Sequence, residues 1–540
     1  MKVGQEMMRD KKRIAAQDIF AMAATALICL ALHGYRFANS MFSHDALIEI
    51  VQDDAAWQVA LGRFFEPVLV FLRGNLCSPW LLCLLQMVWL ALSVSLLADI
   101  FQIRDKFMIL AVAGIVAGSE TFIIINASFL ACADMYAFAL FAGIFGVWCI
   151  EKRKFLYTLL GIIFMIISIA TYQAYISVAI ALMLILAILQ MCDFSKDLKK
   201  IIKRLLYYAV VLLLAAVVYY MAWQLIRGVL GIWAADTYNG MASVGHYEAG
   251  VLLDSVQTAY KNMLVCFLSP AEMSNIVFRG IKLGNIWKYA VIAVNAAMAA
   301  VILANIVYIC RKQMIGHRLR NADLIVRCVL IVLALLLFPL GCNFVCVMSK
   351  GMEHPLMMFG FNMLYVFAAA TAERIRYSTD VQTLTGDDKR QFWRTTDAGI
   401  VAILAGVLIW NHFIYANQIY FKKSLQEKAA YSVMSRIVTD VEDVPGYVPG
   451  ITPVAISGYF EASPYLTELS GFEDLTSDFM GKTSLTYQGT DYAMLTYYLS
   501  IDLNLTRVDA SMEAVQQMPV YPAEGSVSMV DGVVVIKVSD

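Results

Sequence analysis

The sequence predicts an all-α polytopic membrane protein of about eleven transmembrane helices, followed by a small extracytoplasmic α/β domain. Hydrophobic residues make up 60% of the 540 positions and charged residues only 15%, whereas a soluble domain carries about 25% charged residues. The mean hydropathy of +0.68 agrees. Residues 1–414 carry 34 Lys and Arg against 26 Asp and Glu, and residues 415–540 carry 7 against 16. We therefore expect a membrane domain over 1–414 and a soluble, acidic domain over 415–540.

The same composition excludes several classes of protein. A disordered chain, a coiled coil, a collagen and a protein that binds nucleic acid through a basic surface all need other balances of charge and apolar residues. All 11 Cys lie between Cys29 and Cys346, without the spacing of zinc ligands or of a disulfide framework. The N-terminal apolar run, 19–32, has no convincing signal cleavage site after it, which indicates an uncleaved first membrane helix.

Apolar runs of about 17–25 residues are long enough to cross a bilayer core as helices. Eleven such runs occur in this chain. They lie at about 17–38, 80–98, 107–126, 134–150, 155–172, 174–191, 205–226, 287–310, 322–342, 355–372 and 396–414.

The distribution of Lys and Arg predicts the orientation of these spans, because basic residues near helix ends favour the cytoplasm. With the N-terminus inside, the cytoplasmic segments carry 25 Lys and Arg, against nine on the opposite face outside the C-terminal block. An odd number of crossings then puts residues 415–540 outside the cell membrane.

Polar sequence is concentrated on this predicted outer face. The segments 39–79, 227–286 and 343–354 are too long or too polar to be turns, whereas the cytoplasmic connections are short and contain no nucleotide-binding motif. A membrane protein with its polar sequence on one face usually works on that face. We therefore look for the functional residues there.

The C-terminal block has the pattern of a small α/β domain. A helical stretch over 420–441 is ended by the Pro and Gly residues of 445–450, and a strand-like run follows at 454–460. Asp531-Gly532 separates two β-branched runs, which is a strong hairpin signal because both turn residues must accept positive φ. The block shows no nucleophile motif and no cluster of metal ligands.

The first outer segment contains an unusual group of acids. If residues 45–60 are helical, Asp45, Glu49 and Asp53 share one face, with Asp54 beside them. Like charges at this spacing destabilise one another and raise at least one pKa. Such an arrangement needs a reason: a cation, a general base or an Arg partner. The alternative is a solvated helix that lies on the lipid headgroups.

Five other residues on the outer face are weaker candidates for a substrate site. Asp134 either faces a cavity, since an acid is costly against lipid, or caps a helix. Tyr172 suits the aromatic belt of a membrane helix, and Gln173 beside it is less usual there. Lys350, near His354, either binds a phosphate or extends along the membrane interface.

Three stretches of the chain resemble a known family. They are SHDALIEIVQDDAAWQVALGRFFEPVL after the first span, TYQAY near the middle, and MPVYPAEGSVSMVDGVVVIKV at the C-terminal end. Together they look like the bacterial integral-membrane glucosyltransferases related to phage serotype-converting glucosyl transferase II, whose plan is similar to that of the GT-C superfamily. The likeness covers most of the membrane block and, among longer relatives, the C-terminal domain.

The resemblance implies a glycosyltransferase that moves a sugar, glucose in this family, from a polyprenyl-phosphate donor to a cell-surface glycan at the outer leaflet. It implies Asp45 as the leading catalytic acid, Asp53 or Asp54 as the second, and Arg63 as part of a Gly-Arg pair. The segment SKGMEHPLMMFG departs from the family because it lacks an Arg near the phosphate, a role left to Lys350 or His354. A divalent cation shared by Asp45 and Asp53 is compatible with the sequence but not required by it.

Two functions of other classes remain open from the sequence. A transporter or flippase of lipid-linked glycans predicts charged residues inside the spans and internal repeats, whereas most spans here are plain Leu, Ile, Val and Ala without an evident repeat. A receptor or scaffold with an outer sensor domain leaves the acidic first segment unexplained.

Overall fold

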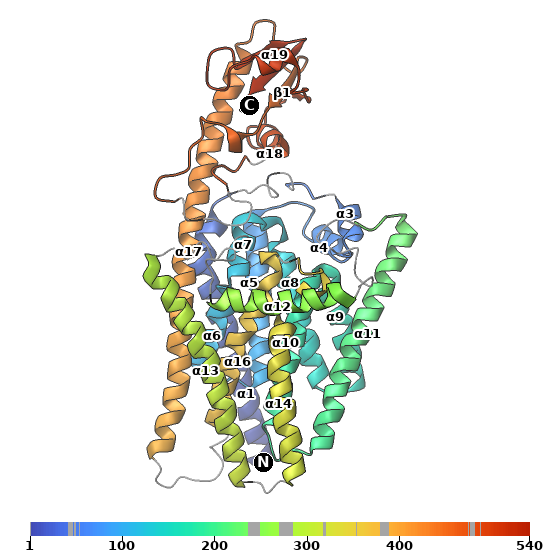
Figure 1. The fold of residues 1–540 in the computed structure, drawn as a ribbon, viewed down its shortest axis with the longest axis vertical. Helices are drawn as coiled ribbons and strands as arrows, with labels where there is room; N and C mark the ends of the chain where they lie inside the picture. The colour runs from blue at the N-terminus through green and yellow to red at the C-terminus, as the bar shows by residue number, and fades with distance from the viewer. Residues whose placement is uncertain are drawn as a thin grey trace.

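The computed structural model describes residues 2–41, 47, 50–52, 54–235, 249–268, 284–316, 320–352, 354–377, 388–472, 475, 481–485 and 488–540. They form a bundle of helices, from one end of which a small domain extends on the long helix α17 (Asp388–Glu442; Figure 1). We call this end of the bundle the domain-side end. The N-terminal part of α1 lies at the opposite end (Figure 1).

The bundle confirms the predicted fold class. Ten segments of the described chain are long and apolar enough to span a membrane, and α9 is a shorter apolar helix of 17 residues. The predicted spans correspond to these eleven segments. Besides α17, the helices are α1 (Lys2–Ala38), α5 (Pro79–Phe101), α6 (Lys106–Ala117), α7 (Glu120–Ser128), α8 (Ala133–Glu151), α9 (Phe155–Thr171), α10 (Ile176–Met191), α11 (Leu198–Leu230), α13 (Gly284–Gly316), α14 (Asn321–Cys342) and α16 (Met363–Tyr377).

Two spans that the sequence predicts as continuous helices are interrupted. The span over 107–126 breaks at Gly118, and the Ser119 side chain then caps α7 by accepting from the Phe122 N–H. The span over 355–372 begins with the 3-10 helix η5 (Pro355–Asn362), which leads into α16. Both segments are almost entirely buried. Irregular backbone at membrane depth is tolerated where protein surrounds it or where it lines a cavity.

Small residues bring neighbouring spans close together. Helices α8 and α9 meet at Gly146 and Gly161, where a Cβ on Gly146 would lie 3.0 Å from the Gly161 carbonyl oxygen. Small residues at helix contacts let backbones approach in membrane proteins, where lipid is as apolar as the side chains and packing drives association.

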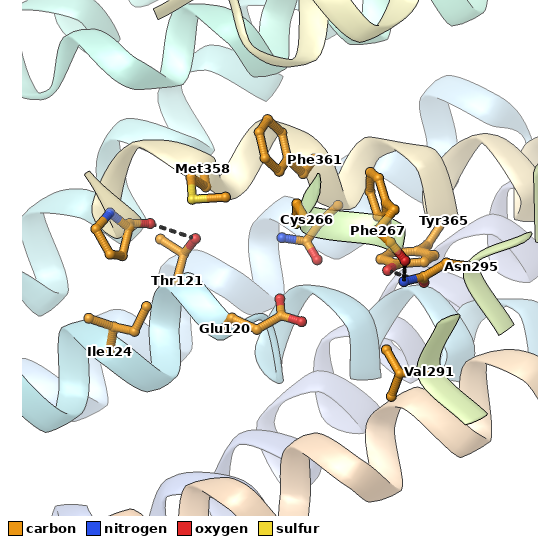
Figure 2. A pocket seen from close by; sticks show the side chains of 12 residues that line it. Glu120, Thr121, Ile124, Cys266, Phe267, Val291, Asn295, Met358, Phe361 and Tyr365 are labelled. Carbon is orange, nitrogen blue, oxygen red and sulfur yellow. Dashed lines mark hydrogen bonds between the residues drawn. The ribbon is translucent and has the colours of Figure 1, made fainter. Parts of the chain in front are cut away.

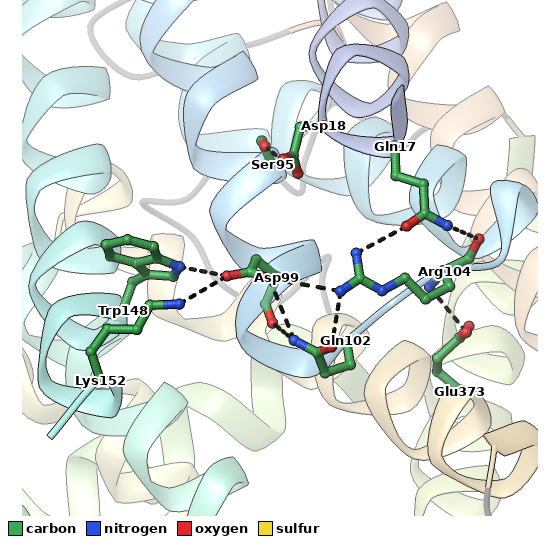
Figure 3. A network of polar contacts seen from close by, with 9 residues as sticks. All are labelled: Gln17, Asp18, Ser95, Asp99, Gln102, Arg104, Trp148, Lys152 and Glu373. Carbon is green, nitrogen blue, oxygen red and sulfur yellow. Dashed lines mark hydrogen bonds and ion pairs between the residues drawn. The ribbon is translucent and has the colours of Figure 1, made fainter. Parts of the chain in front are cut away.

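A polar network joins neighbouring helices at the opposite end of the bundle (Figure 3). Asp99 accepts from Trp148 Nε1 at 2.7 Å and from Lys152 Nζ at 3.3 Å, and it lies 3.8 Å from the Arg104 guanidinium. The Arg104 backbone N–H donates to Glu373 at 3.0 Å. Lys152 and Arg104, two of the basic residues predicted to face the cytoplasm, therefore help to join α5, α8 and α16.

Short elements cover the domain-side end. Helix α12 lies across the spans there (Figure 1), and the other elements fill the connections between spans. They are α3 (Ala55–Ala60), α4 (Glu66–Leu72), η1 (Leu130–Cys132), η2 (Gln173–Tyr175), α12 (Ala249–Leu268) and α15 (Phe344–Met348).

The small domain contains a four-stranded sheet in the order β2-β1-β4-β3. Strand β1 (Pro453–Ser457) is parallel to β2 (Asn504–Leu505) and to β4 (Val533–Lys537), and β3 (Val527–Val530) is antiparallel to β4. Asp531 and Gly532 both have positive φ, 47° and 82°, which confirms the predicted hairpin. The short helices η6 (Phe460–Ala462), α18 (Gln488–Ala493), η7 (Met494–Tyr498) and α19 (Glu513–Gln516) complete the domain.

Helix α17 connects the two parts and runs unbroken through residue 414, where the sequence predicts the domain boundary. Within the bundle, His33 of α1 and the Tyr420 hydroxyl of α17 lie 2.7 Å apart in a hydrogen bond. Two residues further, Lys422 donates to the carbonyls of Phe472 and Leu475 and pairs with Glu468 at 2.8 Å. The small domain is therefore attached to the helix by a buried cation.

Candidate functional site

The site is built at the domain-side end, where α3, α4, η2 and the ends of α8 and α11 meet. Two arginines of the first connection between spans, Arg63 and Arg73, enter this region from either end of α4. Arg63 precedes α4 and Arg73 is its C-cap residue. Each arginine has a different set of partners.

Arg73 forms a buried ion pair with Asp134 in the first turn of α8. The two side chains are 2% and 6% exposed. The Arg73 guanidinium also donates to the side chain of Gln52 and, at 2.8 Å, to the Ala131 carbonyl. A buried charge is stable when it is paired and hydrogen-bonded in this way. Asp134, a predicted substrate residue, thus faces a cation and fixes the connection against α8.

Arg63 lies against two stacked tyrosines. Its guanidinium carbon is 4.9 Å from the ring centre of Tyr172, and its NH1 donates to the Tyr136 hydroxyl at 3.2 Å. The rings of Tyr136 and Tyr172 stack at 4.0 Å. The buried Glu66, three residues after Arg63, adds an attractive charge. The structure thereby brings together two predicted site residues, Arg63 and Tyr172, from segments more than a hundred residues apart.

Gln173 positions the backbone that carries Arg63. Its Nε2 donates to the Leu61 carbonyl at 2.7 Å, while the Tyr219 hydroxyl donates to the Gly62 carbonyl at 3.0 Å. Trp223 Nε1 holds the preceding turn through the Val59 carbonyl at 2.7 Å. Gln173, whose amide is unusual in an aromatic belt, therefore holds the backbone next to Arg63 in place.

Gly62 is required at its position by both its backbone and its surroundings. Its φ is +82°, and a Cβ there would lie 2.5 Å from the Tyr219 hydroxyl oxygen and 2.9 Å from Gln173 Nε2. L-residues with a side chain rarely adopt this conformation. The Gly-Arg pair expected from the family resemblance thus has a physical basis in this chain.

A row of aromatic rings leads from Tyr172 into the bundle. Tyr172 contacts Tyr175 at 5.8 Å between ring centres, Tyr175 contacts Phe359 of η5 at 5.8 Å, and Phe359 contacts Phe122 of α7 at 5.5 Å. The buried Tyr175 hydroxyl has no hydrogen-bond partner among the described residues. The row ends at the two interrupted spans.

A small polar cavity lies where these interrupted spans meet α12 and α13 (Figure 2). Its volume of about 20 Å³ is enough for one water molecule, which needs about 10–15 Å³. Glu120 points into the cavity and lies 2.7 Å from His412 Nε2 of α17. Asn295 donates to the Phe267 carbonyl at 3.1 Å and accepts from the Tyr365 hydroxyl at 2.8 Å. Sequence reasoning missed Glu120 and His412, which lie inside apolar runs.

The remaining described candidates lie outside this contact network or at its edge. Asp54 is exposed and caps α3 by accepting from the Trp57 N–H at 3.1 Å. His354 caps η5 and lies edge-on to Phe129, 5.4 Å between ring centres, next to the η1 turn that Arg73 binds. Lys350 is half-buried in a left-handed turn with φ of 55°. The structure does not bring Lys350 together with the two arginines.

The acids that stand out in the sequence, Asp45, Glu49 and Asp53, lie outside the described residues. One continuous helix over 45–60, the condition for these acids to share a helical face, does not form. Val51 forms a β-bridge with Leu76, the Gln52 N–H donates to the Asn75 carbonyl, and helix α3 begins only at residue 55. The segment pairs with the far end of its own connection because Gln52 and Arg73 meet there.

The residues that the structure describes contain no group of three or more His, Cys, Asp or Glu arranged to hold a metal ion. A cation shared by Asp45 and Asp53 therefore stays a prediction, since both residues lie outside the described ranges. The described site offers two guanidinium groups, the buried carboxyl groups of Asp134 and Glu66, and a wall of tyrosines.

Comparison with known protein families gives a match that covers more than half of the chain. Residues 34–370 match the family model described as glucosyl transferase GtrII. The matched range contains both arginines, Asp134, the Tyr172–Gln173 pair and the interruptions of both spans. It ends within α16, before α17 and the small domain. Neither a curated protein nor a solved structure matches the chain.

Proposed function

The chain belongs to the glucosyl transferase GtrII family, and on that premise we propose that it transfers glucose from a polyprenyl-phosphate donor to a cell-surface glycan at the outer face of the membrane. The family and the spans make it a multi-pass membrane glycosyltransferase. The donor, the acceptor and the face of action are our proposal.

The observation that carries the proposal is the pair of arginines at the domain-side end. Arg63 has a half-buried side chain that contacts two neutral tyrosines, with the Glu66 carboxyl group nearby. Its guanidinium is less enclosed than that of Arg73, whose side chain is 2% exposed against Asp134. A phosphate leaving group gains negative charge as its bond to the sugar breaks, and a positioned guanidinium stabilises that charge. Guanidinium groups also match the geometry of phosphate oxygens.

The transfer needs one proton acceptor and one anion stabiliser. A hydroxyl oxygen of the acceptor attacks the anomeric carbon of glucose, the bond between that carbon and the phosphate oxygen breaks, and the bonding electrons leave with polyprenyl phosphate. A carboxylate takes the hydroxyl proton as general base. We assign this proton to Asp45, with Asp53 or Asp54 assisting, and the developing phosphate charge to Arg63.

The outer location follows from the basic residues of the sequence. If the 25 Lys and Arg of the N-terminal segment and of the connections on its side face the cytoplasm, the domain-side end and the small domain face outward. A polyprenyl phosphate presents its sugar at the headgroup level, which is where Arg63 and Arg73 would then lie. The absence of a nucleotide motif from the sequence of the cytoplasmic connections agrees with a lipid-linked donor.

The proposal is tested by transfer of labelled glucose from polyprenyl phosphate by purified protein in nanodiscs. We expect Asp45→Asn to lower transfer by about 10²–10⁴-fold, the contribution of a general base, while donor binding survives. Arg63→Gln should lower transfer by about 10²–10³-fold, as loss of one charge-stabilising donor does. A surface variant, Lys154→Gln at the opposite end, serves as control.

Two results would contradict the assignment. Near-normal transfer by Asp45→Asn would move the base to Asp53 or Asp54. Transfer from a nucleotide sugar in the absence of lipid donor would contradict the polyprenyl-phosphate proposal.

A flippase of lipid-linked glycans is the second candidate, and one observation favours it. Glu120 and His412, two ionisable residues 2.7 Å apart, lie inside the spans next to two interrupted helices. Such features mark transport pathways in other membrane proteins. Vesicles with a fluorescent lipid-linked sugar distinguish the two functions: a flippase moves the lipid across the bilayer without an acceptor glycan, and a transferase does not.

A further inference from the structure

The small domain contains a ligand-sized cavity that lies beyond the range of the family match. Its volume is about 540 Å³, within the range of about 300–1,000 Å³ typical of small-molecule sites. Segments that follow three of the four strands line it, together with α19. The proposed transfer reaction uses none of its residues.

The sheet topology explains why a cavity forms at this place. Strand β1 is parallel to β2 on one side and to β4 on the other, so all three strands end at the same edge of the sheet. The chain leaves β1 toward β2, and β4 later joins β1 on the opposite side. In open α/β sheets a crevice forms outside the carboxyl ends of strands where the order reverses in this way, and ligands bind there.

The loop after β1 is held tightly and exposes a tyrosine ring. Gly458 has φ of +87°, and a Cβ there would lie 2.5 Å from the Ser539 hydroxyl oxygen. The same hydroxyl accepts from the Tyr459 N–H at 3.0 Å. With its backbone fixed, Tyr459 presents a side chain that is 57% exposed at the rim of the cavity.

The charge inside the cavity is neutralised. Lys537 donates to the carbonyls of Gln516 and Met518 at 2.9 and 3.0 Å and pairs with the Asp540 carboxylate at 2.9 Å. Residues 415–540 carry 7 Lys and Arg against 16 Asp and Glu, so the domain repels anions. The remaining polar side chains of the lining are two hydroxyls and an amide, those of Ser457, Tyr459 and Gln516.

A hydroxyl-rich, uncharged ligand fits this lining. Amide and hydroxyl groups act as both donors and acceptors, as sugar hydroxyls require, and an exposed aromatic ring offers an apolar surface with a polar edge. On the basis of the proposed function, we propose that the cavity binds an uncharged oligosaccharide stretch of the acceptor glycan, remote from the point of transfer.

The position of the cavity predicts that only long acceptor glycans can use it during transfer. Helix α19, which contributes Gln516 to the lining, lies at the end of the domain far from the bundle, and α18 lies nearer to it (Figure 1). One glycan that occupies both the cavity and the arginine site must therefore be long. A short acceptor reaches the arginine site without the cavity.

The test uses the full-length protein and the neutral polysaccharide of the source cells, released and separated into long and short fractions. Tyr459→Ala and Gln516→Ala should each weaken equilibrium binding of the long fraction about tenfold, as truncation of a central contact does. The KM for the long acceptor should rise equally, while the KM for the short acceptor and kcat stay unchanged. Tyr431→Ala, which removes a 52% exposed ring of α17 outside the cavity, is the control.

Binding is measured without donor, so the cavity can be judged even if the protein transfers no sugar. Unchanged binding of the long fraction in both variants overturns the proposal, as does absence of binding to the wild-type protein. Equal effects on long and short acceptors also overturn it, because they would place the cavity at the point of transfer. Tighter binding of a sulfated polysaccharide than of the neutral one would overturn it in favour of an anion site.

Discussion

At the scale of single residues, Gly62 is the position where the site tolerates least change. Gly62→Ala combines a positive φ with a Cβ 2.5 Å from the Tyr219 hydroxyl oxygen, so the backbone must shift and displace Arg63 from Tyr172. We expect glucose transfer to fall at least about tenfold, because misplacement by about 1 Å costs that much or more.

Gly74→Ala is the matched control for this prediction. Gly74 lies in the same connection with φ of +85°, but a Cβ placed on it would have no atom within 4 Å. Both variants carry the backbone strain of about 1–3 kcal/mol, and only Gly62→Ala meets a clash. Equal losses of transfer and of thermal stability in the two variants would show that strain, not displacement of Arg63, is the cause.

The buried pair of Arg73 and Asp134 gives the second prediction. Arg73→Met leaves the Asp134 carboxylate buried without its cation, which costs about 3–5 kcal/mol. We expect a large fall in melting temperature in detergent. The double variant Arg73→Met with Asp134→Leu should recover much of this loss, since replacing a whole buried pair by apolar residues is often neutral. A double variant as unstable as the single one would contradict the pairing as the cause.

These residues also show what the sequence alone could predict. The sequence predicts Tyr172 and Gln173 as site residues because they are polar residues between apolar spans. It predicts Arg63 because the segment around it resembles a family motif. Arg73 is not among the site residues predicted from the sequence, because its partner Asp134 is 61 residues away and no local pattern indicates such a contact. Glu120 was hidden inside an apolar run, and its relation to His412 depends on the packing of α7 against α17.

At the scale of elements, the membrane spans were predictable because the length of an apolar run is enough to identify a helix that can cross a bilayer. The interruptions were not, since Gly118 and Ser119 hardly change the hydropathy of a long apolar run, and η5 differs from an α-helix only in its backbone. An i, i+4 spacing of acids is compatible with a helix over 45–60, but it gives no information on the β-bridge between Val51 and Leu76, which interrupts such a helix. The predicted hairpin at Asp531-Gly532 is confirmed because the two turn residues themselves determine whether the backbone can adopt positive φ.

The short helix α18 gives a prediction about pH. Asp491 in this helix is fully buried, beside the side chain of Thr490. Burial raises the pKa of Asp491 well above its usual value. The folded domain thus keeps a proton that the unfolded chain releases above about pH 4. As the pH rises above about 4, the free energy of unfolding of the domain therefore falls by about 1.4 kcal/mol per pH unit for as long as Asp491 stays protonated in the folded state.

Asp491→Asn should therefore stabilise the small domain at pH 7 and leave it nearly unchanged at pH 4. Hydrogen exchange of β1 and β4 in the full-length protein measures this, because these strands exchange only when the domain opens. Asp502→Asn, at an exposed position of the same domain, is the control. Slower exchange at pH 7 in Asp491→Asn is expected, and faster exchange at pH 7 would show that the ionised carboxylate has a stabilising partner.

At the scale of the whole molecule, α17 joins an arginine site in the bundle to a sheet domain with its own cavity. Its 55 residues correspond to about 80 Å of helix at 1.5 Å per residue. Because Lys422 and its partners fix the domain to this helix, the cavity has a defined position relative to the bundle. A rigid link of this kind suits an enzyme whose acceptor is a polymer held at two points.

This arrangement depends on the orientation of the chain in the membrane, which is the last prediction. Eleven crossings, by the ten described spans and α9, would put the N-terminus and the small domain on opposite sides of the membrane. The 25 basic residues of the N-terminal segment and of the connections on its side predict that this side is cytoplasmic. A Cys placed at the exposed Glu524 should react with a membrane-impermeant maleimide added to intact cells or spheroplasts. A Cys placed at the exposed Lys154 should react only after lysis. The wild-type protein measures the background from its native Cys, all of which lie before the small domain. The opposite labelling pattern would put the arginine site on the cytoplasmic side, where a nucleotide sugar rather than a lipid-linked one would be the accessible donor.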